Sequence, residues 1–142
     1  MTPTEKLQQF ITSMLEWETT LDKLKKTKEY NDDPEVRNNI LQSKRSELFE
    51  IFTNSLTSRA FKNIAKGRLD ILATARPPEY AQEILENTLE TDDRTTLICT
   101  HNKKSILPYR RYTLITKNED TRIDKVEGRI SANEEWHNVK SI

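Results

Sequence analysis

The N-terminal part of the chain repeats apolar residues with the period of an α-helix. Steps of three and four positions separate Leu7, Phe10, Met14, Trp17, Leu21 and Leu24. This spacing places all six on one face of a helix over about three heptads. Thr2, Pro3 and Glu5 precede the stripe and are typical of a helix start with a capping box. We therefore predict a long first helix that packs across a sheet, with a coiled coil as the alternative.

The following segment contains the same start signal and predicts two more helices. Asp33, Pro34 and Glu35 supply a cap, a proline in the first turn and an acidic residue. The positions expected to face inward are Val36, Ile40, Leu48, Ile51 and Phe52, and those expected outside or at the margins are Lys44, Arg45, Glu47 and Glu50. A short third helix is expected from Leu56 to about Gly67, because glycine favours the turn that ends a helix.

After Gly67 the pattern changes to the alternation that is typical of β-strands. The expected strands are residues 68–74, 84–90, 94–100, 109–117 and 122–130. Turns at 91–93 and 118–120 join the last four strands into two pairs. Helices followed by an antiparallel sheet indicate an α+β fold. The length of 142 residues fits a single domain 1–142, with a helical part at 1–66 and a mainly antiparallel sheet at 67–142.

The stretch PYRRYTLI, residues 108–115, places two arginines between two tyrosines. In a strand, Tyr109 and Arg111 share one face, whereas Arg110, Tyr112 and Leu114 share the other. A surface for single-stranded nucleic acid needs its aromatics and cations together. The chain also has 23 basic and 23 acidic residues and so no net charge. We predict no nucleic-acid partner, and we expect Tyr112 and Leu114 to point inward and Arg111 to point outward.

The composition narrows the range of functions further. Only two glycines are present, which excludes a glycine-rich phosphate loop. Neither His101 nor His137 has a second histidine or cysteine at ligand spacing, so no metal site or cofactor is expected. The single cysteine fits a reducing compartment, and the start of the chain shows no signal peptide. Since no apolar run reaches the ~20 residues of a membrane span, we predict a soluble, cytoplasmic, non-enzymatic protein.

Charge is segregated along the second half of the chain. Residues 79–93 contain six acidic and no basic residues, whereas residues 94–117 contain six basic and no acidic ones. Neighbouring strands of this kind can form cross-strand charge pairs, worth about 0.2–1 kcal/mol each. The alternative is an acidic rim that faces a basic partner and is formed by Glu86, Glu90, Asp92 and Asp93.

Scattered residues along nearly the whole chain carry a resemblance. They are Trp17-Glu18, Ile51-Phe52, Thr57, Gly67-Arg68, Pro77-Pro78-Glu79-Tyr80, Ile98, Thr100, Tyr109-Arg110-Arg111-Tyr112-Thr113-Leu114, Arg122-Ile123-Asp124 and Trp136. In this order they resemble the bacterial immunity proteins with a nuclear transport factor 2-like fold, which accompany polymorphic toxins. One position departs from the pattern, since Thr121 stands where an aromatic residue is expected.

The resemblance implies a cone, in which a strongly curved antiparallel sheet wraps around the long N-terminal helix and encloses a cavity. It implies a protein that binds and neutralises a cognate toxin domain, usually encoded by the adjacent gene. We expect the acidic rim and Arg111 to contact the toxin, and Tyr112, Leu114 and Asp124 to line the cavity. We expect a monomer or weak homodimer.

The same cone also occurs in small enzymes and ligand-binding proteins, and fold alone does not fix function. This alternative would require Asp124, Tyr112 or His101 to line an accessible pocket. A homo-oligomeric scaffold that uses an exposed sheet face is a third possibility.

Overall fold

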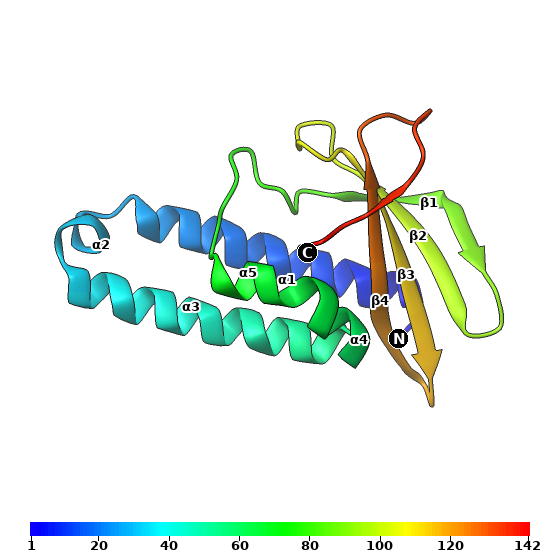
Figure 1. Ribbon diagram of the computed structural model, residues 1–142, viewed down its shortest axis with the longest axis horizontal. Coiled ribbons are helices and arrows are strands. Elements are labelled where there is room, and N and C mark those ends of the chain that lie inside the picture. Colours follow the sequence, from blue (N-terminus) through cyan, green and yellow to red (C-terminus); the bar gives the residue numbers. More distant parts are fainter.

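The computed structural model describes residues 1–142, apart from the side chains of residues 87–90. A helical layer comes first in the chain and a five-stranded antiparallel sheet follows (Figure 1). The helices are α1 (Pro3–Lys25), α2 (Lys28–Asp32), α3 (Pro34–Ser55), α4 (Ser58–Ala60), the π-helical turn η1 (Phe61–Ala65) and α5 (Lys66–Asp70). The strands are β1 (Glu83–Thr91), β2 (Thr95–His101), β3 (Tyr109–Lys117), β4 (Asp120–Arg129) and β5 (His137–Asn138). The predicted α+β class is confirmed.

Both long helices begin where the sequence predicts. The Thr2 hydroxyl accepts a hydrogen bond from the Glu5 backbone N–H, and the Glu5 carboxylate accepts one from the Thr2 N–H, which completes the capping box. Asp33 caps α3 through the backbone N–H groups of the two residues after Pro34. The two helices lie side by side, and their ends near α2 project away from the sheet (Figure 1).

The buried face of α3 differs from the predicted one. Lys44, expected at the margin, is buried, whereas Ile40 and Ile51 are only partly buried. The Nε1–H of Trp17 in α1 donates to the Lys44 carbonyl at 2.9 Å, so the two helices meet at this turn. The Lys44 stem lies in the interface and its ammonium group reaches Glu47 at 3.0 Å. A long side chain can bury its methylenes while its charge keeps a partner.

The segment after α3 is helical for longer than expected. Helical structure runs from α4 through η1 to Asp70, so the predictions of a helix end at Gly67 and of a strand at 68–74 are wrong. Gly67 does not adopt a positive φ angle. Arg68 is buried from within α5, and the chain then crosses in an extended loop to β1.

The sheet has the strand order β1-β2-β3-β4-β5. The two predicted hairpins are present, with Thr95 paired to Ile115 between them. The strand register shifts between Thr113 and Leu114, where β4 has the extra residue Asp124. A bulge of this kind bends its strand and increases the local twist.

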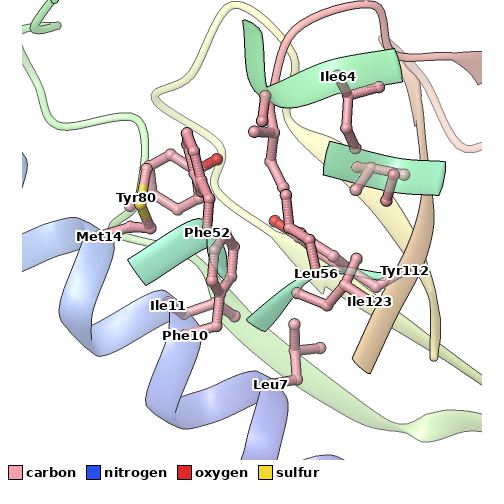
Figure 2. Packing of buried hydrophobic residues seen from close by; sticks show 14 of the residues in the cluster. Leu7, Phe10, Ile11, Met14, Phe52, Leu56, Ile64, Tyr80, Tyr112 and Ile123 are labelled. Atoms are coloured by element: carbon pink, nitrogen blue, oxygen red, sulfur yellow. The ribbon is translucent and has the colours of Figure 1, made fainter. Parts of the chain in front are cut away.

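The core lies between the helices and the inner face of the sheet. Figure 2 shows α1 side chains directed toward residues of α3, β3 and β4. The fully buried aromatic and aliphatic members include Phe10, Met14, Phe52, Tyr80, Tyr112, Leu114 and Ile123. The last residue, Ile142, is also buried, and its N–H donates to the Ile64 carbonyl at 2.9 Å.

Candidate functional site

The alternation of β3 separates two surfaces with different chemistry. Arg110, Tyr112 and Leu114 are buried on the inner face, whereas Tyr109 and Arg111 are half-buried on the outer face. The predicted directions of Tyr112, Leu114 and Arg111 agree with this alternation. The sheet therefore presents an outer surface and, behind it, a set of buried polar groups.

An aromatic and guanidinium ladder lies on the outer face. The Arg111 guanidinium donates two hydrogen bonds to Glu127, each 3.0 Å long. The Trp136 ring covers both Arg111, at 4.8 Å, and Arg129, at 4.0 Å, measured from ring centroid to guanidinium carbon. Arg129 also lies 5.9 Å from the Tyr109 ring centroid. Paired and stacked guanidinium groups hold a fixed geometry, so this end of the outer face is preorganised.

The outer face continues from the ladder to the tip of the β1–β2 hairpin. Leu97 pairs with Thr113, and Thr95 pairs with Ile115, one step nearer the tip. These four side chains are half-buried. We use the name outer sheet surface for the ladder residues Arg111, Glu127, Arg129 and Trp136 together with Thr95, Leu97, Thr113 and Ile115.

The predicted acidic rim lies at the hairpin tip and along β1. Glu86, Asp92 and Asp93 are exposed, and none forms an ion pair with another residue whose side chain the structure describes. Glu90 lies outside the described side chains. The Asp92 carboxylate accepts the Asp93 backbone N–H at 2.7 Å. Asp92 and Asp93 therefore present two exposed carboxylates at the tip of the β1–β2 hairpin, and Glu86 presents a third farther along β1.

Glu79 belongs to the same acidic segment but has a different environment. Its two carboxylate oxygens bind Arg110 Nη2 at 2.5 Å and Arg68 Nη1 at 3.1 Å. Burial disfavours the charged carboxylate, yet the guanidinium groups of Arg110 and Arg68 outweigh it and lower the pKa of Glu79. The adjacent Tyr80 is fully buried, with both guanidinium groups near its ring at 5.8 and 5.6 Å. We call Arg68, Glu79, Tyr80 and Arg110 the Glu79 cluster.

A second buried carboxylate anchors the loop that carries this cluster. Glu18 of α1 is fully buried and accepts the backbone N–H groups of Ala75, Glu79 and Tyr80 at 3.0–3.2 Å. Three such donors satisfy a buried carboxylate without a cation. Sequence reasoning assigned no function to Glu18 or to the Glu79 cluster, although all five residues are among those that carry the resemblance.

The residues predicted to line a cavity lie in two places. Tyr112 and Leu114 are fully buried in the core, and the Tyr112 hydroxyl donates to Gln82 at 2.7 Å. Burial raises the pKa of this phenol. Asp124 occupies the β4 bulge, accepts the Thr57 hydroxyl at 2.8 Å and pairs with Arg59. It lines a shallow surface pocket of about 550 Å³ beside α4.

Metal-binding clusters and membrane-spanning helices are two further features that the described residues bear on. Among the residues whose side chains are described, no three or more His, Cys, Asp or Glu residues gather closely enough to hold a metal ion. In the same part of the chain, every helix is too short or too polar to cross a bilayer.

Comparison with protein families identifies a match over nearly the entire chain. The family described as NTF2 fold immunity protein matches residues 2–140. Comparisons with curated proteins and with solved structures give no match.

Proposed function

Because the chain belongs to the NTF2 fold immunity protein family, we propose that it binds a cognate toxin domain and neutralises it by covering the toxin's active site. The toxin is encoded by the adjacent gene, and the complex forms in the cytoplasm of the cell that makes both proteins. The immunity protein acts as a monomer or weak homodimer, without catalysis or a cofactor.

The outer sheet surface is the structural feature that supports this proposal most strongly. Its centre is mainly aliphatic and hydroxyl-bearing, and the Arg111–Trp136 ladder lies at one end. Interfaces are enriched in Arg and Trp, and residues that dominate binding are often of these types. Since Arg111 is already paired with Glu127 and stacked on Trp136, little side-chain entropy is lost when a partner binds.

The acidic residues give the surface a preferred partner. Glu86, Asp92 and Asp93 are exposed, and we include Glu90, which lies in β1 with Glu86, in the contact region. A negative patch attracts a basic cleft, such as the substrate channel of a nuclease, and accelerates encounter. We therefore assign Glu86, Glu90, Asp92, Asp93 and Arg111 to the toxin interface.

Growth rescue tests the function itself. The C-terminal domain encoded by the adjacent upstream gene is expressed in bacteria with and without this protein. We expect growth to be restored and the two proteins to copurify as a stable complex. If the domain is toxic, the immunity protein is folded and growth is not restored, the proposal fails.

Charge reversal tests the interface. The double variant Asp92→Lys, Asp93→Lys is expected to reduce the association rate about tenfold at low salt, and the difference should shrink as salt screens the charges. The matched control is Glu29→Lys, Asp32→Lys, which makes the same charge change in α2, at the far end of the molecule (Figure 1). Surface-binding kinetics that are equal for both variants would remove the hairpin tip from the interface.

A further inference from the structure

The loop between β4 and β5, residues 130–136, ends at the ladder of the outer sheet surface. It is built around Glu134, whose carboxylate accepts the Ile130 backbone N–H at 2.9 Å. The Glu134 carbonyl accepts Arg129 Nη1 at 3.2 Å. These bonds define the path by which the loop returns to the sheet at Trp136. Loops that a rigid scaffold positions often carry binding residues.

Trp136 is a large aromatic residue that the core does not use. Among the described residues, the hydrophobic core and the apolar side chains packed against it include Trp17 but not Trp136. The Trp136 side chain is half-buried, and its ring lies against the guanidinium groups of Arg129 and Arg111 instead. Tryptophan is enriched among the residues that dominate protein interfaces. An indole placed outside the core is therefore available for a partner.

Arg129 holds this ring in place. Its guanidinium carbon lies 4.0 Å from the Trp136 ring centroid and 5.9 Å from the Tyr109 ring centroid. Tyr109 in turn stacks on His101, with ring centroids 4.7 Å apart. Because a cation and an aromatic ring attract each other in this arrangement, Arg129 links the indole to a row of rings that belongs to the sheet.

The surroundings of the ring define the kind of partner surface that fits it. Arg111 lies on the other cation contact at 4.8 Å and is held by two hydrogen bonds to Glu127. Two guanidinium groups beside the ring repel a basic side chain, whereas the indole offers mainly apolar area. The matching surface is thus an apolar recess without basic residues. It differs from the basic cleft that we assign to the acidic hairpin tip.

We infer that Trp136 is the contact that sets the lifetime of the toxin complex and discriminates between toxins, and that Arg129 is the positioning residue that holds its ring. The indole enters an apolar recess, free of basic residues, on the cognate toxin domain. This inference rests on the proposed function. Charges at the hairpin tip act over a distance and change the association rate, whereas a packed side chain acts only at contact and changes the dissociation rate.

Surface-binding kinetics with the C-terminal domain encoded by the adjacent upstream gene test the role of Trp136. We expect Trp136→Ala to raise the dissociation rate about thirtyfold and to leave the association rate within about twofold. Trp136→Phe, which keeps an apolar ring, should raise the dissociation rate less than Trp136→Gln, which introduces a polar side chain. The matched control is Phe49→Ala, which truncates a 53% exposed aromatic side chain of α3 and should change neither rate.

The outcomes separate this inference from the proposed function. If Trp136→Ala and the unmodified protein dissociate equally fast, the inference fails, while growth rescue by the unmodified protein leaves the proposed function intact. A Trp136→Ala variant that circular dichroism shows to be unfolded would make the ring structural and would also overturn the inference. Equal dissociation rates for Trp136→Phe and Trp136→Gln would exclude an apolar recess. An unmodified protein that neither binds nor rescues would overturn both proposals.

A double-mutant cycle tests the positioning role of Arg129. Arg129→Ala should raise the dissociation rate about tenfold, and Arg129→Lys should raise it less, because it keeps the cation but not the planar guanidinium group. In the Trp136→Ala background, Arg129→Ala should have no further effect, since Arg129 acts through the ring. Additive effects of the two substitutions would mean that Arg129 acts independently of Trp136, and they would overturn its assignment as a positioning residue.

Discussion

Single residues show how this small core holds charge. Glu18 and Arg110 have exposures of 0% and 3%, although ionised groups are rarely buried unless they are paired. Glu18 is satisfied by backbone donors, whereas Arg110 pairs with Glu79 through one of its guanidinium nitrogens. Both the hydrogen bonds of Glu18 and the ion pair of Arg110 involve the loop at residues 75–80. This loop therefore connects α1 to the sheet through polar contacts in addition to apolar packing.

The pKa of Glu79 leads to a prediction for acid stability. Its folded-state pKa is lowered from the ordinary value of 4.5, so the carboxylate contributes stability above about pH 4.5. That contribution is lost as the pH falls from the ordinary value through the folded one. Replacing Glu79 with Gln should reduce the free energy of unfolding by about 1.5–3 kcal/mol at pH 7 and should flatten its decline below pH 4.5. Urea unfolding between pH 7 and 3 measures both effects.

The control for this experiment is Glu86→Gln, which removes a carboxylate that is exposed on β1. We expect the acid profile of this variant to follow that of the unmodified protein. If the free energy of unfolding falls with the same slope below pH 4.5 in Glu79→Gln and in the unmodified protein, then protonation of Glu79 does not cause the loss of stability in acid.

At the scale of elements, the sequence predicts features that depend on neighbouring residues, but not those that depend on contacts between distant residues. The capping residues Thr2 and Asp33 identify their helices because each bonds within its own first turn. The apolar residues of the stretch 68–74 predict a strand, yet α5 extends into this stretch. There Arg68 forms an ion pair with Glu79, eleven positions away, which local periodicity does not indicate. The β3–β4 turn was predicted, but its positive φ angles at Asn118 and Glu119 were not. Glutamate gives little indication of that conformation.

The two glycines lead to a prediction of opposite effects. A Cβ atom at Gly128 would come within 2.7 Å of Leu107 Cγ, whereas one at Gly67 would meet only the Ser141 side chain, with 3.2 Å to Oγ. Gly128→Ala should therefore destabilise the protein by about 1–3 kcal/mol through overpacking. Gly67→Ala lies in the exposed part of α5, where alanine is preferred over glycine by about 0.5–1 kcal/mol. Because Ser141 is exposed and can move, this variant should be neutral or more stable.

Urea unfolding monitored by far-UV circular dichroism compares the two alanine variants. The structure requires that Gly128 provide space for Leu107 in the loop that precedes β3. A Gly128→Ala variant as stable as the unmodified protein would show that Leu107 and its loop rearrange without cost.

At the scale of the whole molecule, the sites depend on contacts that sequence periodicity does not encode. Glu79 meets Arg110 across 31 positions, and Trp136 meets Arg111 only because β5 and the preceding loop return to β4. Strand alternation predicted which β3 residues face outward, since it is a local property. It did not predict that Arg110, on the inward face, would find a carboxylate there. The resemblance included these residues without giving their roles.

The same long-range contacts predict one cooperative unit for residues 1–142, and the two tryptophans test it. Trp17 reports on the helical layer, where its Nε1–H binds Lys44, and Trp136 reports on the outer sheet surface. The variants Trp136→Phe and Trp17→Phe each leave one fluorophore. In each variant we expect the urea midpoint from fluorescence to coincide with that from far-UV circular dichroism. The reason is that Glu18 and Ile142 tie the loop and the C-terminal segment to the helices.

A Trp136 fluorescence signal that changes at lower urea than the circular dichroism would contradict this prediction. It would mean that the C-terminal segment unfolds separately and that the ladder loses its fixed geometry before the rest of the fold is lost.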